Sequence, residues 1–136
     1  MTDPTRLTMT QQVAAPPERV YAAWTDVALL ATWWWPQLPD TTYALDPMPG
    51  GRYRFRSEAA GIGVHGEVVA LDPPHRLELT WVWEDGGTDG PEERVVVQVE
   101  AHGDGTLVTV THEVADVASV AGYRQGWGDC LVRLAP

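Results

Sequence analysis

The sequence contains no lysine, and its nine basic residues are all arginines, set against 19 acidic residues. The formal net charge at pH 7 is −10. Affinity for nucleic acids and for anionic membrane surfaces depends on basic side chains that face phosphate groups. We therefore expect neither a nucleic-acid partner nor a membrane partner.

Cysteine is also scarce. Cys130 stands alone, which excludes an intramolecular disulfide and a cysteine-rich zinc site. The segment Gly61-Ile62-Gly63 lacks the third glycine and the strand–helix context of a dinucleotide-binding motif. The histidines do not show the close spacing of zinc ligands; they are His65, His75, His102 and His112. We expect no metal and no cofactor.

Long apolar runs are missing as well. No stretch approaches the about 20 residues that span a bilayer, and the first residues lack the apolar segment of a signal peptide. The length of 136 residues fits one domain. We expect a single domain over residues 1–136. We also expect a location in the cytoplasm, where thiols are kept reduced and an unpaired cysteine is common.

Tryptophan, by contrast, is abundant. Seven occur, and three are consecutive at Trp33, Trp34 and Trp35, before Pro36. In a regular helix or strand, adjacent side chains point in different directions. We therefore do not expect all three indoles to enter one core, and we expect at least one to line a cavity, a surface or a partner.

Periodicity and turn residues predict the order of elements. A strand over 6–14 is followed by a helix opened by Pro16-Pro17 and a second short helix from Asp26 through Trp34. Further strands are predicted at 41–46, 51–58, 62–72, 76–84, 93–102 and 106–115, and a mobile loop at 85–92. Apolar residues at helical spacing predict a final amphipathic helix of about 17 residues, weakened by three glycines. The fold class is α+β, with a curved antiparallel sheet around this helix and a cavity between them.

Several motifs occur in the order of one known family: Ala15-Pro16-Pro17-Glu18-Arg19-Val20-Tyr21, Trp33-Trp34-Trp35-Pro36, Gly50-Gly51-Arg52-Tyr53-Arg54-Phe55, Pro73-Pro74-His75-Arg76-Leu77 and Gly126-Trp127. In these motifs the chain resembles small proteins similar to the activator of the heat-shock protein 90 ATPase, in the START-like (SRPBCC) superfamily. The resemblance implies a helix-grip fold of about seven strands, with two short helices after the first. Trp35 stands where the family usually has a small residue, so we expect it to fill or gate a pocket.

Strand alternation selects the candidate ligand-binding residues. Large apolar side chains recur at every second position of the predicted strands and should face inward. The predicted ligand-binding set consists of Trp35, Tyr53, Phe55, Trp81, Trp83, His112 and Trp127. On the opposite face of 51–58, alternate arginines should lie outside and pair with glutamates of neighbouring strands.

The catalytic residues are left unknown, with three candidates. His112 shares the inner face of its strand, either as a structural histidine or as an acid–base group of the cavity. His65 and Glu67 share one face of another strand. That face is the outer one if the apolar residues opposite them face the core, and an inward pair would suit acid–base chemistry.

The sequence is compatible with three functions. The first is binding of a small hydrophobic molecule, aromatic or acyl, between the sheet and the last helix. The second is an enzyme of the cyclase, dehydratase or hydrolase type that uses a cavity histidine. The third, implied by the family resemblance, is a co-chaperone-like interaction protein. A homodimer through exposed tryptophans stays open.

Overall fold

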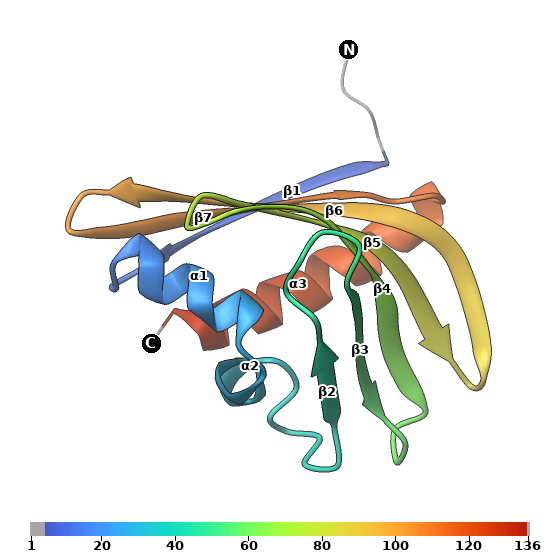
Figure 1. The fold of residues 1–136 in the computed structure, drawn as a ribbon. Coiled ribbons are helices and arrows are strands. Elements are labelled where there is room, and N and C mark those ends of the chain that lie inside the picture. The colour runs from blue at the N-terminus through green and yellow to red at the C-terminus, as the bar shows by residue number, and fades with distance from the viewer. Residues whose placement is uncertain (1–4, 136) are drawn as a thin grey trace.

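The computed structural model describes residues 5–135 (Figure 1). The N-terminal strand and two short helices are β1 (Arg6–Val13), α1 (Pro17–Thr25) and α2 (Val27–Trp33). Six strands follow: β2 (Thr42–Leu45), β3 (Arg52–Ser57), β4 (Ile62–Asp72), β5 (Arg76–Asp85), β6 (Thr88–His102) and β7 (Gly105–Glu113). The chain continues through the short 3-10 helix η1 (Val117–Ser119) into α3 (Val120–Leu134). This order confirms the predicted helix-grip fold.

The strands form one antiparallel sheet in the order β1-β7-β6-β5-β4-β3-β2. In Figure 1 the sheet curves around α3, while α1 and α2 lie on the same concave side. The first and last strands of the sequence pair with each other, so that Leu7 stands opposite His112. In Figure 1 the hairpins of β4, β5 and β6 curl on the side where α3 begins, and residues of β5 and of the start of α3 line one pocket.

The short helices begin where their sequence signals predict. Pro17 occupies the first turn of α1, where its missing N–H costs no intrahelical hydrogen bond. The Asp26 side chain caps α2 by accepting a hydrogen bond of 2.9 Å from the Ala28 backbone N–H. α2 therefore begins directly after Asp26 and ends at Trp33, the first residue of the tryptophan run.

The prediction of a mobile loop at 85–92 is wrong. Asp85 pairs with Thr88, and β6 begins at Thr88. Gly86 and Gly87 adopt φ values of 60° and 84°, which are the left-handed values that a two-residue hairpin turn requires. The glycines therefore mark a tight turn, and the residues beyond them continue the ladder.

The expectation for the tryptophan run is also wrong in part. Trp33, Trp34 and Trp35 are all buried, with exposed fractions of 2%, 4% and 8%. The prediction assumed a regular element, but α2 ends at Trp33, Trp34 is extended (φ −89°, ψ 104°) and Trp35 has φ 52°. Because the backbone changes direction at each residue, three adjacent indoles enter one core.

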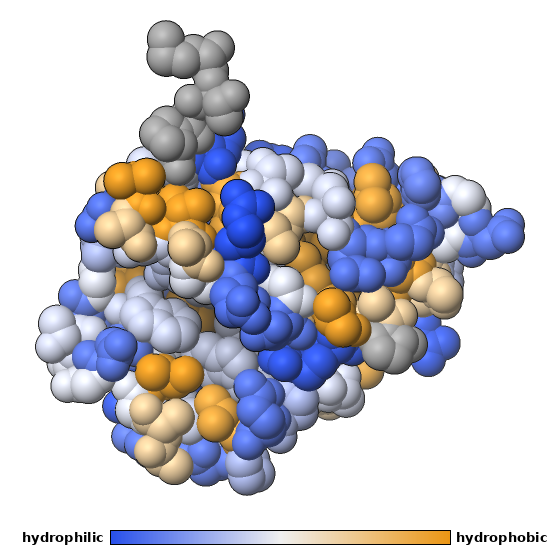
Figure 2. Space-filling model, turned by 180° about the vertical axis from the view of Figure 1, so that it is seen from behind, coloured by the Kyte–Doolittle hydropathy of each residue, from blue (hydrophilic) through white to orange (hydrophobic). Residues whose placement is uncertain are grey.

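The surface offers little to a partner that would dock on tryptophan. Six of the seven tryptophans are buried and Trp83 is half-buried, so the exposed tryptophans on which a homodimer would rest are not found among the described residues. Figure 2 shows the hydrophobic residues of one face in small groups with hydrophilic residues between them. In the part of the chain that the structure describes, no helix is both long and apolar enough to cross a membrane.

Candidate functional site

A pocket with a volume of about 380 Å³ opens between α3, β5 and the segment that follows α2. Its walls are largely aromatic, and its lining comes from elements that are far apart in the sequence. The lining residues are Trp34, Trp35, Trp81, Trp83, Ser119, Gly122, Tyr123, Gly126, Trp127 and Cys130. The pocket thus lies in the predicted place, between the sheet and the last helix.

Two glycines of α3 create part of this space. A Cβ atom built at Gly122 or at Gly126 would have no neighbour within 4 Å. Both residues line the pocket, so the side chains that they lack would otherwise fill it. Glycine costs an α-helix up to about 1 kcal/mol relative to alanine. In α3 the two glycines lower the stability of the helix and leave open volume at the pocket wall.

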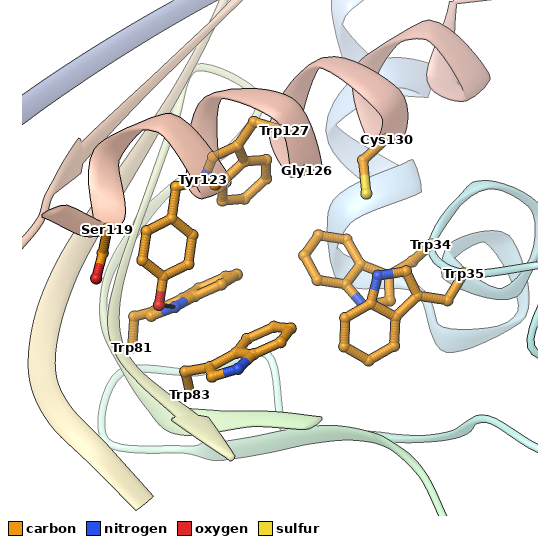
Figure 3. Close-up of a pocket in the computed structure, with 10 residues that line it drawn as sticks. Trp34, Trp35, Trp81, Trp83, Ser119, Tyr123, Gly126, Trp127 and Cys130 are labelled. Atoms are coloured by element: carbon orange, nitrogen blue, oxygen red, sulfur yellow. Dashed lines mark hydrogen bonds between the residues drawn. The ribbon is translucent and has the colours of Figure 1, made fainter. Parts of the chain in front are cut away.

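The rings meet mainly edge to face or tilted, which is the favourable arrangement for aromatic pairs. Trp81 lies 5.3 Å from Trp127 between ring centroids, and Trp34 lies 5.6 Å from Trp127. Trp35 stands perpendicular to Trp83 at 5.7 Å. Figure 3 shows Tyr123 and Trp127 of α3 above the two sheet tryptophans, with Trp34 and Trp35 closing the other end. Such contacts pre-form the walls.

The pocket is electrically neutral at physiological pH. Among the described residues that line it, none carries a formal charge. Burial raises the pKa of Tyr123 to about 12 and the pKa of the Cys130 thiol to about 11. Both groups therefore stay protonated near neutrality. The Tyr123 hydroxyl accepts a hydrogen bond of 3.2 Å from Trp81 Nε1 and is a polar group beside the apolar walls.

His112 lies behind the pocket wall and is fully buried, with an exposed fraction of 0%. Its ring contacts Tyr123 at 4.3 Å between centroids, but His112 is not among the lining residues. Nε2 lies 2.7 Å from Glu93 Oε1, and Trp127 Nε1 donates to Nδ1 at 3.1 Å. The other Glu93 oxygen accepts from the Ala115 backbone N–H. Both ring nitrogens of His112 are thus engaged by protein groups.

These partners determine the tautomer of His112. An indole N–H only donates, so Nδ1 must accept from Trp127 and Nε2 must carry the proton that Glu93 accepts. Burial lowers the pKa of His112 and outweighs the opposite effect of the Glu93 carboxylate. The arrangement is that of a neutral, structurally satisfied histidine. Protonation would break its bond to Trp127.

Tyr53 and Phe55 lie deeper than the pocket. They line a smaller inner void of about 20 Å³ that shares Trp34, Trp81 and Trp127 with the pocket as a common wall. Of the predicted ligand-binding set, the pocket brings together Trp35, Trp81, Trp83 and Trp127. Tyr53, Phe55 and His112 support the walls from behind.

Comparison with known proteins identifies the family. A family model described as "Activator of Hsp90 ATPase homolog 1-like protein" matches residues 14–136. The chain belongs to this family. Family membership confirms the resemblance seen in the sequence. No curated protein matches the chain.

Solved structures share the fold of this family member over nearly its whole length. DynU16, a protein in the dynemicin biosynthetic locus, has a TM-score of 0.82 and 25% identity over 98% of this chain. The match covers 46% of DynU16, so this chain spans less than half of that protein. CalU16 from Micromonospora echinospora has a TM-score of 0.75 and 25% identity over 96% of this chain and 71% of CalU16. CV1439 from Chromobacterium violaceum has a TM-score of 0.78 and 25% identity over 98% of this chain and 96% of CV1439.

The other two catalytic candidates of this family member lie on the convex face of the sheet, away from the pocket. His65 stands opposite Arg54, and Glu67 stands opposite Arg52, on the face that the arginines occupy. His65 Nδ1 lies 2.8 Å from Glu84 Oε2, and Glu67 is exposed. The apolar alternation favoured the outer face for His65 and Glu67, and both residues lie on that face.

Glu84 organises this outer face. It accepts two hydrogen bonds from Arg54, at 3.0 and 2.7 Å, and one from Arg56 at 3.0 Å. Arg56 reaches across β4 because Gly63 has no side chain; a Cβ there would lie 3.2 Å from Arg56 Cβ. Hydrogen bonding by Arg54 lowers the pKa of Glu84 to about 2. The predicted arginine–glutamate pairing therefore exists, centred on a carboxylate that is nearly buried.

The same cluster includes donor atoms of a kind that bind metals. Ligand atoms of His65, Glu84 and Asp89 lie within 4.8 Å of one another. However, the arginines already engage both Glu84 oxygens, Arg54 Nε at Oε2 and Arg54 and Arg56 at Oε1, and they neutralise its charge. A cation would have to displace them, so we interpret this cluster as a salt-bridge network.

Sequence reasoning missed several residues of the site. Trp34, which lines the pocket, is absent from the predicted ligand-binding set. Tyr123 and Cys130 are absent from it too, although they share the helical spacing of Trp127 in the last helix, which was a usable signal. Glu93 lies two residues before Val95 and shares the inner face of β6 with it. This spacing could have revealed a buried carboxylate beside His112.

Proposed function

We propose that this protein binds a small hydrophobic molecule, aromatic or acyl, in the pocket between α3 and the sheet. The observation that carries the proposal is a pocket of about 380 Å³ with uncharged, mainly indole walls. Pockets for small ligands usually measure about 300–1,000 Å³ and combine apolar walls with a few polar groups. Tyr123 and Ser119 supply such groups here.

Family and composition support the same proposal. The helix-grip fold of the family curves a sheet around a helix and leaves room between them. DynU16, which this chain resembles, lies in a biosynthetic locus. The unpaired Cys130 and the net charge of −10 suit a function in the cytoplasm away from nucleic acids.

A filled pocket tests the proposal. Gly126→Leu places a side chain in the open volume without a close neighbour, so the fold should persist. We expect this variant to bind the apolar probe 2-isopropenylnaphthalene at least about tenfold more weakly than the wild type, because leucine occupies the site. Titration of tryptophan fluorescence measures the binding.

Gly128→Ala is the matched control. Gly128 lies in the same helix and does not line the pocket; its Cβ would meet only Met9 Cε at 3.8 Å. Alanine adds a similar gain in helix propensity without filling the pocket, so binding should match the wild type. If Gly126→Leu and the wild type bind the probe equally well, the probe does not bind in this pocket and the proposal is wrong.

The two other functions receive less support. An enzyme that uses His112 needs that ring to meet the ligand, whereas His112 is fully buried and both of its nitrogens are engaged. An enzyme that uses His65 with Glu67 would work on the opposite face of the sheet. A co-chaperone-like role rests on the family description alone.

A further inference from the structure

Two indole N–H groups in the core have no acceptor. Among the described residues, Trp24 Nε1 and Trp34 Nε1 are the buried side-chain polar atoms without a hydrogen-bond partner. A buried donor left unpaired costs about 1–3 kcal/mol, and native proteins keep few of them. By contrast, Trp33, Trp81 and Trp127 all donate to acceptors within the protein. The two unpaired donors therefore call for an explanation.

Both unpaired tryptophans line the inner void, and Trp34 also lines the pocket. They pack against the same ring, since Trp24 lies 6.0 Å and Trp34 lies 5.6 Å from Trp127 between centroids. The void of about 20 Å³ is large enough for one water-sized atom but not for a ring. The pocket beside it is large enough for an aromatic body.

The charges around the pocket and the void limit the class of ligand that can bind there. Neither the pocket nor the void is lined by a charged side chain among residues 5–135. Two ionised groups lie behind the walls: the Glu93 carboxylate bonds to His112, and the Arg133 guanidinium donates to the Trp33 carbonyl and to Cys130 Sγ. Both are engaged by protein groups and neither lines the pocket, so a carboxylate ligand would lose its hydration without a free cation in exchange, which is costly. A neutral acceptor avoids that cost and satisfies an indole N–H.

We propose that the ligand is a neutral carbonyl compound with an apolar, aromatic body. The body fills the pocket, and the carbonyl oxygen enters the inner void, where Trp34 Nε1 donates to it and Trp24 Nε1 is a second donor. Entry requires small side-chain rotations at the shared wall of Trp34 and Trp127. This inference rests on the proposed function and adds to it the class of ligand and its polar subsite.

Three probes of one shape test it. 2-Acetylnaphthalene carries the carbonyl, 2-isopropenylnaphthalene replaces the oxygen by a methylene group, and 2-naphthoate carries a negative charge. One hydrogen bond is worth a factor of about three to ten, so the wild type should bind the ketone tighter than the alkene by that factor. The naphthoate should bind more weakly than the ketone. The infrared carbonyl stretch of the bound ketone should lie below its value in hexane.

Variants identify the donor. Trp34→Phe keeps an aromatic ring and removes the N–H, so the preference for the ketone should disappear and the carbonyl stretch should return toward its hexane value. Trp83→Phe removes a different indole of the same pocket. In this variant the preference for the ketone over the alkene and the lowered carbonyl stretch should both remain. Trp24→Phe should reduce the preference in part.

The outcomes separate the two proposals. If the alkene binds and the ketone shows neither tighter binding nor a shifted carbonyl stretch in the wild type, the carbonyl subsite is wrong and the pocket stands. A ketone preference that survives Trp34→Phe also overturns the subsite, as does tighter binding of the naphthoate. If no probe binds the wild type, the proposed function and this inference both fail.

Discussion

At the scale of single residues, His112 shows how a polar group is accommodated in an apolar core. Its two nitrogens bond to Glu93 and Trp127, which join β7 to β6 and to α3. The protein therefore uses His112 to connect three elements. The neutral tautomer is required by the indole donor, and a charged ring would lose that bond.

This arrangement predicts a pH dependence of stability. The pKa of His112 is lowered from 6.5 in the folded protein, so below about pH 6.5 the unfolded chain binds this proton more readily than the folded one. The free energy of unfolding should therefore fall as the pH is lowered from 8 to 5. In His112→Gln, which can still accept from Trp127 and donate to Glu93, this part of the decrease should be absent. Urea unfolding at several pH values measures it, and an unchanged pH slope in the variant would contradict the assignment.

Trp35 adopts φ 52° although it is not glycine. The left-handed region costs an L-residue about 1–2 kcal/mol, and here the edge-to-face contact of Trp35 with Trp83 helps to offset that cost. We expect Trp35→Gly to be more stable than Trp35→Ala by about 1 kcal/mol, because both lose the indole ring and only glycine relieves the backbone. Urea midpoints with equal slopes measure the difference.

Thr32 supplies the control for that comparison. It lies in the last turn of α2 and is exposed. There the order should reverse, with Thr32→Ala more stable than Thr32→Gly, as helix propensity predicts. If alanine were the more stable residue at both positions, the strain assigned to Trp35 would be wrong.

At the scale of elements, Glu84 ties β3, β4 and β5 together on the outer face. Its side chain is 5% exposed and accepts charged hydrogen bonds from Arg54 and Arg56. Glu84→Gln should lower the free energy of unfolding by about 2–3 kcal/mol, because it weakens charge-assisted bonds to a nearly buried group. Glu58→Gln removes an exposed partner of Arg56 and should leave stability unchanged. Equal effects of the two changes would contradict the central role of Glu84.

The same carboxylate adds a second pH effect at acid pH. Its pKa is lowered from 4.5 to about 2 in the folded protein. The stabilisation is therefore fully present above pH 4.5 and is lost as the pH falls toward 2. Acid unfolding followed by circular dichroism should show a shallower loss over this range in Glu84→Gln than in the wild type.

α3 combines two demands in one helix. Trp127, Cys130 and Leu131 are its buried residues and anchor it to the core, whereas Gly122 and Gly126 leave space at the pocket. We expect Gly122→Ala to raise the free energy of unfolding by up to about 1 kcal/mol, since its Cβ meets nothing and alanine favours the helix. Thermal unfolding measures the gain, and a loss of stability would show that the space at Gly122 is not open.

At the scale of the whole molecule, a ligand that occupies the pocket holds α3, the sheet and the segment after α2 together. Such a ligand binds only the folded state, so 2-isopropenylnaphthalene at 100 times its Kd should stabilise the protein by about 2.7 kcal/mol. Gly126→Leu, with binding at least about tenfold weaker, should gain at most about 1.4 kcal/mol at the same concentration. Differential scanning calorimetry measures both, and an equal stabilisation of Gly126→Leu and the wild type would place the ligand elsewhere.

The fold could be predicted largely from the sequence because its signals are local. Alternation in β5 placed Leu77, Leu79 and Trp81 inside, and all three are buried. The helical spacing of Tyr123, Trp127 and Cys130 predicted the face of α3 that meets the pocket. The loop prediction at 85–92 failed because the turn ends with Gly87: the positive φ values of Gly86 and Gly87 build a tight turn, and Thr88 already belongs to β6.

The candidate site was harder to predict, because its members meet through non-local contacts. Trp34 reaches the pocket only because the backbone leaves the helix after Trp33 and turns again at Trp35. The bond from His112 to Glu93 joins neighbouring strands, and the bond from Trp127 comes from a helix that packs across them. No periodicity in the sequence records such distances.

Sequence alone determined the class of molecule: an acidic chain, rich in tryptophan, with a helix-grip order of strands and helices. Residue spacing carries this information because side-chain direction repeats along each regular element. Only the tertiary structure decided which tryptophans line a pocket, which lie behind it, and which two N–H groups lack an acceptor. These properties depend on how elements distant in the sequence pack against one another, and packing fills some volumes while it leaves others open.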